Sequence, residues 1–275
     1  MSDLSDKDLR RFIDEDLGSA GDVTSKALLT DQRAEGDLLA KQYCILAGLS
    51  EAGEVFEYFD VEVERVAGDG DEAQSREVVM RVAGEATAIL AAERLALNIA
   101  TRMTGIATLT HELMMTCRKK NPDVKVAATR KTTPGFRRYE KKAVDIGGGM
   151  THRHGLYDGV IIKDNHLAFM SIREAVRKAK QKLDMPVEVE VETVEEAVIA
   201  AEEEADVIML DNMPPAKGKI AASEAREVYP DVVIEVSGGI TPDNITNYTY
   251  ADVISLGWLT HSVKSADLSL DLRRA

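Results

Sequence analysis

Aromatic side chains are scarce in this sequence of 275 residues, where they make up 5% of the positions and include one tryptophan. The hydrophobic fraction is nevertheless 44%, which is ordinary for a globular protein. A chain of this length buries a sizeable core, and we expect that core to consist mainly of aliphatic residues and methionine. One large domain and one smaller domain are the organisation expected for this length.

Cysteine is also rare, and the two cysteines, Cys44 and Cys117, lie in no Cys-x-x-Cys or Cys/His pattern. This argues against a zinc site and predicts buried or partly buried thiols in a reducing compartment. The segment from Met1 to Asp16 is charged throughout and lacks the apolar stretch of a secretory signal. No apolar run approaches the roughly 18 residues of a membrane span. We therefore expect a cytoplasmic location.

Basic residues are in the minority: 34 lysines and arginines stand against 48 aspartates and glutamates, which gives a formal net charge of -14. Nucleic acids and anionic membranes are bound by basic patches. Neither is therefore expected as the main partner, and small molecules are the expected ligands. Against this acidic background, any local cluster of basic residues is conspicuous.

The first third of the chain predicts a small α+β domain. Ser5 is expected to cap an N-terminal helix. Strand-like runs then follow, separated by turns rich in glycine and aspartate. These runs are Gly36–Ala40, Tyr43–Ala47, Val61–Val66 and Val78–Val82.

A helical pattern runs from Thr87 to Met114, with apolar residues at helical spacing and Arg94 among them. Gly105 is expected to divide this stretch into two helices, because glycine weakens a helix interior. The predicted N-terminal domain covers residues 1–104.

Short apolar strands then alternate with helical stretches, which is typical of a parallel sheet. The six strand candidates are Val124–Thr129, Gly159–Lys163, Val187–Val191, Val207–Leu210, Val232–Val236 and Val253–Leu256. The helical segments between several of them are Ser171–Leu183, Val194–Glu204 and Ala216–Val228. Such strands either close into a (β/α) barrel or form an open, doubly wound sheet. We assign residues 105–264 to a (β/α) barrel catalytic domain and residues 265–275 to a tail that packs back on the N-terminal domain.

Polar groups follow nearly every predicted strand. Those at the strand ends are Thr129-Arg130-Lys131, Lys163-Asp164-Asn165-His166, Asp211-Asn212, Ser237-Gly238-Gly239 and Gly257. Glu188 and Glu190 lie within the third strand, and His152 and Arg153 lie between the first two. The active site of a (β/α) barrel is built at the C-terminal ends of its strands. The pattern therefore predicts a site, which a purely structural barrel would not need.

The first group of these residues is cationic or can become so: Arg130, Lys131, His152, Arg153 and Lys163. Arginine pairs with carboxylate or phosphate through two parallel hydrogen bonds, and lysine supplies a point charge. The cluster therefore predicts a substrate that carries several negative charges.

A second group consists of the carboxylates Glu190 and Asp211. Carboxylates near bound phosphates typically hold Mg²⁺, so Mg²⁺ is the expected cofactor, reached mostly through substrate and water. Ser237, Gly238 and Gly239 offer backbone N–H groups at a strand end, and with Gly257 they are typical of a phosphate site on the last strands of a barrel.

Each residue has a plainer explanation when it is taken alone. A single lysine or arginine is usually a solvated surface charge, and Glu190 alone is equally a salt-bridge partner inside a barrel. His166 and His261 alone are compatible with purely structural roles. The joint occurrence of these groups at strand ends is what favours a functional site.

The chain resembles the quinolinate phosphoribosyltransferase family, also called carboxylating nicotinate-nucleotide pyrophosphorylase. The matching segments are Gly21-Asp-Val-Thr-Ser, Thr129-Arg-Lys-Thr-Thr-Pro-Gly-Phe-Arg-Arg, Lys142-Ala-Val-Asp-Ile-Gly-Gly-Gly, Thr151-His-Arg-His-Gly-Leu, Ile162-Lys-Asp-Asn-His, Glu188-Val-Glu, Leu210-Asp-Asn, Val236-Ser-Gly-Gly-Ile and Gly257-Trp-Leu-Thr-His-Ser. They occur in order over nearly the whole chain.

The resemblance implies an N-terminal open-faced α+β sandwich domain and an incomplete (β/α) barrel. It implies a pentosyltransferase that makes nicotinate mononucleotide, CO₂ and pyrophosphate from quinolinate and phosphoribosyl pyrophosphate with Mg²⁺, a step of NAD biosynthesis. It also implies a homodimer or a homohexamer whose active sites are shared between subunits.

The resemblance also implies roles for single residues. The family grips the quinolinate carboxylates at positions matching Arg130, Arg153 and Lys163, with His152 beside them. Arg94 matches an arginine supplied by the neighbouring subunit, and Lys131 a lysine near the pyrophosphate and the reacting centre. Glu190 and Asp211 match the family's carboxylates around the ribose and the metal. The 5-phosphate is bound at Ser237, Gly238, Gly239 and Gly257, and Thr129 and His261 complete the expected substrate-binding set.

Other interpretations are a molybdate-transport-associated paralogue with different or no transferase activity, a nicotinate-using phosphoribosyltransferase without decarboxylation, and a ligand-sensing module. The intact Lys163-Asp-Asn-His and Thr151-His-Arg segments favour the true transferase over the paralogue. The number of cations favours an acid with two carboxylates over nicotinate. A sensing module would leave Lys131, Glu190 and Asp211 without a role.

Overall fold

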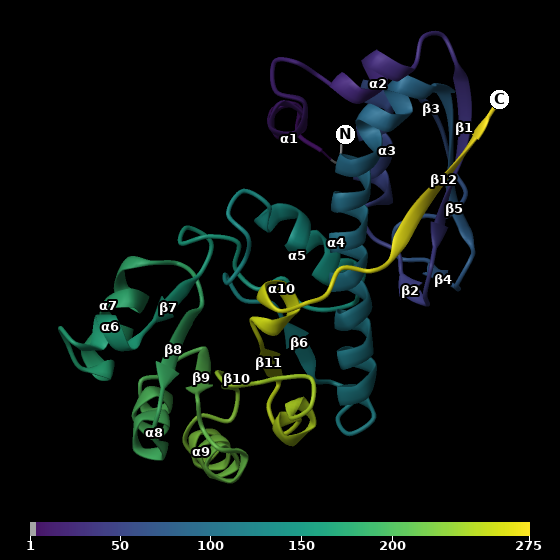
Figure 1. The fold of residues 1–275 in the computed structure, drawn as a ribbon. Coiled ribbons are helices and arrows are strands. Elements are labelled where there is room, and N and C mark those ends of the chain that lie inside the picture. Colours follow the sequence, from purple (N-terminus) through teal and green to yellow (C-terminus); the bar gives the residue numbers. More distant parts are fainter. Residues whose placement is uncertain (1–3) are drawn as a thin grey trace. The chain divides into compact units, whose positions relative to one another are not determined.

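The computed structural model describes residues 4–275, which form two compact units (Figure 1). One unit contains the chain up to Leu109 together with Val263–Ala275, and the other is Thr110–Ser262. Helix α4 (Ala86–Arg118) contributes residues to both. None of the helices formed by residues 4–275 has the length and apolar content that crossing a bilayer requires.

The first unit has the predicted α+β composition. Its other helices are α1 (Asp6–Leu17), α2 (Val23–Leu28) and α3 (Leu49–Tyr58), and its strands are β1 (Arg33–Ala40), β2 (Cys44–Ile45), β3 (Glu62–Arg65), β4 (Glu72–Ala73), β5 (Val78–Glu85) and β12 (Leu268–Arg274). Ser5 caps α1 by accepting the Asp8 N–H at 3.1 Å, as its sequence position predicts. The main sheet has the strand order β12-β1-β5-β3, and β2 pairs with β4.

Strand β12 returns from the C-terminal end of the barrel unit to pair with the first strand of the chain. Leu38 of β1 lies between Leu270 of β12 and Met80 of β5 in the antiparallel register. Alternate residues of β1 are buried, which is the pattern of a strand with one face on the core. Leu38 itself is 1% exposed.

Helix α4 is continuous through Gly105, so the predicted division into two helices is wrong. The reason lies in the packing of the returning chain. A Cβ atom at Gly105 would come within 2.3 Å of the Lys264 carbonyl oxygen and 3.1 Å of the Ala266 nitrogen. Glycine is needed here for the close approach of another backbone segment, and packing offsets its low helix propensity.

The second unit contains a six-stranded sheet of order β6-β11-β10-β9-β8-β7, in which all neighbouring strands are parallel. The strands are β6 (Lys125–Ala127), β7 (Val160–Ile162), β8 (Val187–Val191), β9 (Val207–Asp211), β10 (Val233–Ser237) and β11 (Val253–Ser255). The first strand, β6, pairs with the last, β11, as in a barrel, whereas β6 and β7 do not pair with each other within residues 4–275. The sheet is therefore an incomplete (β/α) barrel, and the open, doubly wound alternative does not apply.

Helices connect these strands: α5 (Arg137–Ile146), α6 (Asp164–Leu167), α7 (Ile172–Lys182), α8 (Val194–Glu202), α9 (Pro215–Val228), the 3₁₀ helix η1 (Ile245–Tyr248) and α10 (Trp258–His261). Ser171 and Thr193 begin α7 and α8 with capping boxes, in which the cap side chain and a glutamate three residues later satisfy each other's backbone N–H groups. Helices α8 and α9 pack side by side (Figure 1).

The two faces of the barrel strands have opposite character. Val189, Ile208 and Ile234 lie in register on neighbouring strands and are fully buried. The alternate positions on the same strands carry the charged Glu190 and Glu235, which both pair in register with Met209 of the strand between them. Because side chains alternate between the faces of a strand, an apolar face and a polar face follow directly from the Val-Glu-Val-Glu-Val sequence of β8.

Candidate functional site

A cavity of about 490 Å³ opens at the C-terminal ends of the barrel strands and over their polar face. The predicted residues that line it are Thr129, Arg130, Lys131, His152, Arg153, Lys163, Glu190, Asp211, Ser237, Gly238 and Gly239. A smaller cavity of about 180 Å³ is lined by Gly257 and His261 and shares Lys131, Ser237, Gly238 and Gly239 with the first. Most of the predicted set is therefore brought together in one region.

One end of this region, which we call the cationic end, is formed by Arg130, Arg153 and Lys163. Arg130 follows β6, and Lys163 follows β7. The loop with Arg153 is tied to β6 through Met150, whose N–H donates to Val126 O at 2.8 Å and whose carbonyl accepts the Ala128 N–H at 2.9 Å. Arg153 donates to the Gly159 carbonyl at 3.0 Å, and burial together with the charge of Arg130 lowers its pKa.

Lys163 forms an ion pair with Glu190 across the cavity. The Lys163 side chain is 40% exposed and that of Glu190 is 13% exposed, so the pair is only partly removed from water. Both residues were predicted to contact substrate. The pairing implies that an incoming ligand with charges of either sign competes for one partner of this ion pair.

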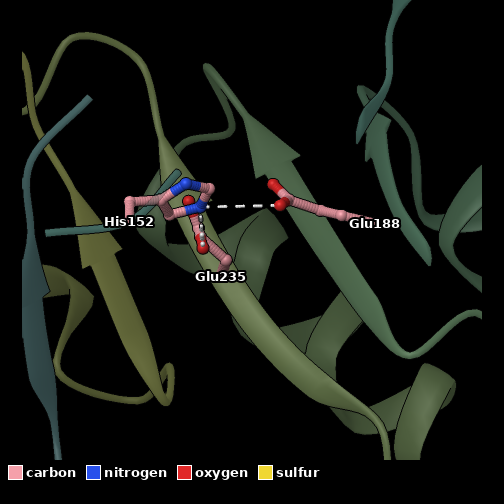
Figure 2. Close-up of side chains that lie close together, drawn as sticks. All are labelled: His152, Glu188 and Glu235. Carbon is pink, nitrogen blue, oxygen red and sulfur yellow. Dashed lines mark ion pairs between the residues drawn. The ribbon is translucent and has the colours of Figure 1, made fainter. Parts of the chain in front are cut away.

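His152 lies between two buried carboxylates in the barrel interior (Figure 2). Its Nε2 is 3.5 Å from Glu188 Oε2 and 3.3 Å from Glu235 Oε2, and its Nδ1 accepts the Arg153 N–H at 2.8 Å. Both ring nitrogens thus have protein partners. His152 also has a φ of 52°, a left-handed conformation that is uncommon for residues other than glycine.

The charges around His152 change its pKa. Burial alone would lower the pKa of His152, but the hydrogen bonds and negative charges of Glu188 and Glu235 outweigh burial and raise it to about 9. The Arg153 N–H bond needs an unprotonated Nδ1, so it opposes that rise. Burial raises the pKa of the Glu188 carboxyl, while the hydrogen bond to His152 acts in the opposite direction.

Two sets of donors could hold a cation. His152, Glu188 and Glu235 offer atoms that all lie within 4.8 Å of one another, but Arg153 is a close positive charge. Glu190 and Asp211 lie on the neighbouring strands β8 and β9, two residues apart in register, and both line the cavity. Their oxygen ligands at an open cavity suit a Mg²⁺ ion that also takes water and phosphate oxygens.

The opposite end, which we call the glycine end, consists of Ser237, Gly238, Gly239 and Gly257. Gly238 has a φ of 85° and Gly239 a φ of 62°. A Cβ at Gly238 would lie 2.4 Å from Asn212 Oδ1 and 2.8 Å from the Asn212 nitrogen. A Cβ at Gly257 would lie 2.9 Å from Lys131 Cδ. The backbone at Gly238 and Gly257 therefore packs so closely against Asn212 and Lys131 that a side chain at either position would clash.

Several buried polar atoms around the cavity have no hydrogen-bond partner among residues 4–275. They are Arg130 Nε, Glu188 Oε1, Glu235 Oε1 and Ser255 Oγ. Buried polar atoms in folded proteins are usually satisfied by protein, water or ligand. Their concentration here indicates a cavity built for polar contents.

Arg94 is the predicted residue that lines neither cavity. It is exposed on α4, in the first unit. Conversely, Glu235 lines the cavity without having been assigned to it from the sequence. A carboxylate within the apolar run Val232–Val236 was the available signal for Glu235, because charged residues are rarely buried without a partner.

The fold and the cavity together define a class of protein: a two-unit α/β protein whose incomplete barrel presents cations, carboxylates and a glycine-rich backbone to a polyanionic ligand. Comparison with known proteins makes this class specific. The family model for the quinolinate phosphoribosyl transferase C-terminal domain matches residues 106–271, and the model for the N-terminal domain of the same family matches residues 22–104.

Similar proteins from other organisms agree with this family. The probable carboxylating nicotinate-nucleotide pyrophosphorylase of Methanocaldococcus jannaschii is 41% identical, with 100% of this chain and 99% of the relative covered. That of Archaeoglobus fulgidus is 43% identical over 91% of this chain and 97% of the relative. The crystal structure of NadC from Streptococcus pyogenes superposes with a TM-score of 0.90 at 35% identity and covers 100% of both chains. The chain belongs to the quinolinate phosphoribosyltransferase family.

Proposed function

We propose that this protein transfers the phosphoribosyl group of phosphoribosyl pyrophosphate to quinolinate and decarboxylates the product, so that nicotinate mononucleotide, pyrophosphate and CO₂ are formed. The single observation that carries this proposal is the arrangement of the cavity, with its cationic end, its glycine end and carboxylates between them. Quinolinate carries two carboxylates, and phosphoribosyl pyrophosphate carries phosphates on both sides of its ribose. The names of the relatives point to the same reaction.

We place the substrates in the cavity in one orientation. Arg130, Arg153 and Lys163 bind the carboxylates of the pyridine ring, as expected for guanidinium and ammonium groups. The N–H groups beside Ser237, Gly238 and Gly239 bind the 5-phosphate. The ribose then lies next to Glu190 and Asp211, and Lys131, which lines both cavities, lies at the reacting centre.

The chemistry follows from that orientation. As the pyridine nitrogen bonds to the anomeric carbon and the bond to pyrophosphate breaks, positive charge develops on the sugar and negative charge on the leaving group. Glu190 and Asp211 stabilise the first charge, and Lys131 stabilises the second. The alkylated nitrogen then accepts the electron pair of the adjacent carbon–carboxylate bond, and CO₂ leaves. Closure of the site against water favours this last step.

Mg²⁺ is part of this proposal, with Glu190 and Asp211 as the residues that would hold it, mostly through water and substrate. A divalent cation bound there would neutralise charge on the pyrophosphate. The Lys163–Glu190 ion pair supports this assignment, because it shows that the Glu190 carboxylate already binds a positively charged group.

The proposal extends to assembly and location. We infer a homodimer or hexamer in which Arg94 enters the cavity of a neighbouring subunit. Exposed Arg94 supports this, as do large apolar side chains between α5 and β7 and between α6 and α7, since Leu156 is 74%, Tyr157 80% and Phe169 85% exposed. Apolar groups of this size usually mark contact surfaces. The free, buried thiols of Cys44 and Cys117 support the reducing cytoplasm as the location.

The decisive assay supplies quinolinate, phosphoribosyl pyrophosphate and Mg²⁺ and follows CO₂ and nicotinate mononucleotide together. Formation of both in equal amounts, lost on chelation, is expected. Nucleotide without CO₂ would indicate a transferase that does not decarboxylate, and no product from folded protein would refute the proposal.

Subunit sharing has its own assay. Arg94→Ala and Lys131→Ala proteins, each of which is expected to lose most of its activity, are mixed under conditions that exchange subunits. Recovery of activity is expected, because some sites then receive both intact residues. No recovery, when mixed oligomers are demonstrably present, would exclude a role for Arg94 in the neighbouring site.

A further inference from the structure

Helix α5 lies outside the cavity, yet it carries three charged side chains on one face. Arg137, Glu140 and Lys141 are spaced i, i+3 and i+4, which places them together on a helix. Glu140 and Lys141 are both 0% exposed, and none of the three lines a described cavity. We call these three residues the clamp. Fully buried charges require paired partners, and the three residues have partners in the two loops of the cationic end.

The first loop is held by Glu140 and Arg137. The Glu140 carboxylate accepts the Thr133 N–H at 3.0 Å and the Thr133 hydroxyl at 2.9 Å. Arg137 Nε donates to Thr132 Oγ1 at 2.8 Å. Thr132 and Thr133 directly follow Lys131 in the chain, so these bonds fix the end of the segment that carries Arg130.

The second loop is held by Lys141 and Arg137. Lys141 Nζ donates to the Arg153 carbonyl at 2.7 Å and to the Thr151 carbonyl, the two carbonyls on either side of His152. Arg137 Nη1 donates to the His154 carbonyl at 2.9 Å. The clamp therefore contacts backbone directly before and after the left-handed residue of this loop.

The electrostatics show that Lys141 is more than a space-filling residue. Burial, and then the charge of Arg137, lower its pKa to about 8, and Arg130 and Arg153 act in the same direction. An apolar side chain would pack here without the cost of burying a charge beside like charges. The ammonium group offsets that cost by supplying donors to two carbonyls, which no apolar residue can do.

We infer that the clamp residues Arg137, Glu140 and Lys141 are positioning residues that set the separation of the Arg130 and Arg153 guanidinium groups, and thereby the ability of the site to bind two carboxylates at once. This inference rests on the proposed function for its kinetic consequence. Its structural consequence, coupled order in two loops that are distant in sequence, is independent of the substrate.

Lys141→Met tests the inference, with Arg138→Met as the matched control. Arg138 is the exposed neighbour of the clamp on the same helix, and its guanidinium carbon lies 6.0 Å from the centroid of the Tyr139 ring. Misplacing a binding group by about 1 Å can cost on the order of 100-fold in rate. We expect the KM for quinolinate to rise by about tenfold or more in Lys141→Met, while the KM for phosphoribosyl pyrophosphate changes by about twofold or less.

Two further readouts separate positioning from general stability. Lys141→Arg keeps a buried cation with donors and is expected to recover part of the quinolinate affinity. Hydrogen exchange of the amides in residues 130–133 and 151–154 is expected to accelerate together in Lys141→Met and to stay unchanged in Arg138→Met. If Lys141→Met does not fold, Arg137→Met, which removes one bond to each loop from a partly exposed residue, gives the same comparison.

The outcomes are distinguishable from failure of the proposed function. If the unaltered protein makes no nucleotide, the proposed function fails, while the exchange experiment still tests the clamp. Equal rises in both KM values, or loops whose exchange is unaffected by either clamp variant, would overturn the inference.

Discussion

The two ends of the candidate site differ in the groups that they offer to a ligand: side chains at one end and backbone at the other. The cationic end consists of long side chains on loops, which the buried charges of Glu140, Lys141 and the His152 cluster hold in place. The glycine end consists of backbone at strand ends, where left-handed φ angles and close packing against Asn212 fix the geometry. The cationic end binds through side chains, so it needs other charges to position them and it responds to pH. The glycine end binds through backbone N–H groups, so it needs positions without side chains and its donors do not titrate.

Lys131 lines both cavities and is a member of neither end, and its loss should have the largest effect on the site. In Lys131→Ala, we expect turnover to fall on the order of 100-fold or more, because a charge that stabilises the leaving group acts in the transition state. Quinolinate affinity should change by about threefold or less. Steady-state kinetics and calorimetry measure the two quantities, and equal losses in both would contradict this role.

The glycine end can be tested by two neighbouring substitutions. Gly238→Ala adds a Cβ that meets Asn212 at 2.4 Å, whereas the nearest atom to a Cβ at Gly239 is 3.9 Å away. Gly239→Ala should therefore cost about 1 kcal/mol of unfolding free energy from its left-handed φ alone, and Gly238→Ala about 2–3 kcal/mol.

Only Gly238→Ala should also raise the KM for phosphoribosyl pyrophosphate strongly, since its clash moves the backbone at the phosphate site. Urea unfolding and kinetics measure these effects. Equal destabilisation by both substitutions would show that packing against Asn212 does not set this backbone.

The cationic end should depend on pH through His152. Its pKa is raised to about 9 by Glu188 and Glu235, so the protonated ring stabilises the fold fully below its unfolded pKa of about 6.5. That stabilisation is lost as the pH rises through about 9. The difference in unfolding free energy between the natural protein and His152→Asn should shrink by on the order of 1 kcal/mol or more between pH 6.5 and pH 9.5. A difference that is constant across this range would place the pKa of His152 near its ordinary value.

The smallest effect is expected for the ion pair between Lys163 and Glu190. Because the Lys163 side chain is 40% exposed, Glu190→Gln should lower the unfolding free energy by less than about 1 kcal/mol. Thermal melting at low and high salt would measure it. A larger loss would mean that the pair, and not the backbone of β8, holds this wall of the cavity.

Much of the site was predictable because the signals are local. Apolar runs separated by helical stretches located all six barrel strands, and the residues that follow each strand gave the cavity lining. The alternation of valine and glutamate in β8 even indicated which face is polar. These inferences need only the period of a strand and the rule that barrel sites lie at strand ends.

The partners of buried charges were not predictable in the same way. Glu235 lies in an apolar strand and meets His152 only because the barrel curves, and Lys141 meets carbonyls of a loop that is folded back on it. Gly105 shows the converse error. Its sequence position suggested a helix break, because the close contact with Lys264 and Ala266 that requires a glycine cannot be seen in the local sequence. Contacts between distant residues override local propensity in each case.

The pairing of β12 with β1 has a consequence for how the protein is made. The ribosome completes Arg33–Ala40 early, but the neighbour of this strand, Leu268–Arg274, emerges only after the entire barrel unit. During synthesis, one edge of β1 therefore remains unpaired while the strands of the barrel are being made and paired. Because an uncovered strand edge is a template for wrong pairing between chains, the part of the protein made first is the part that stays vulnerable longest.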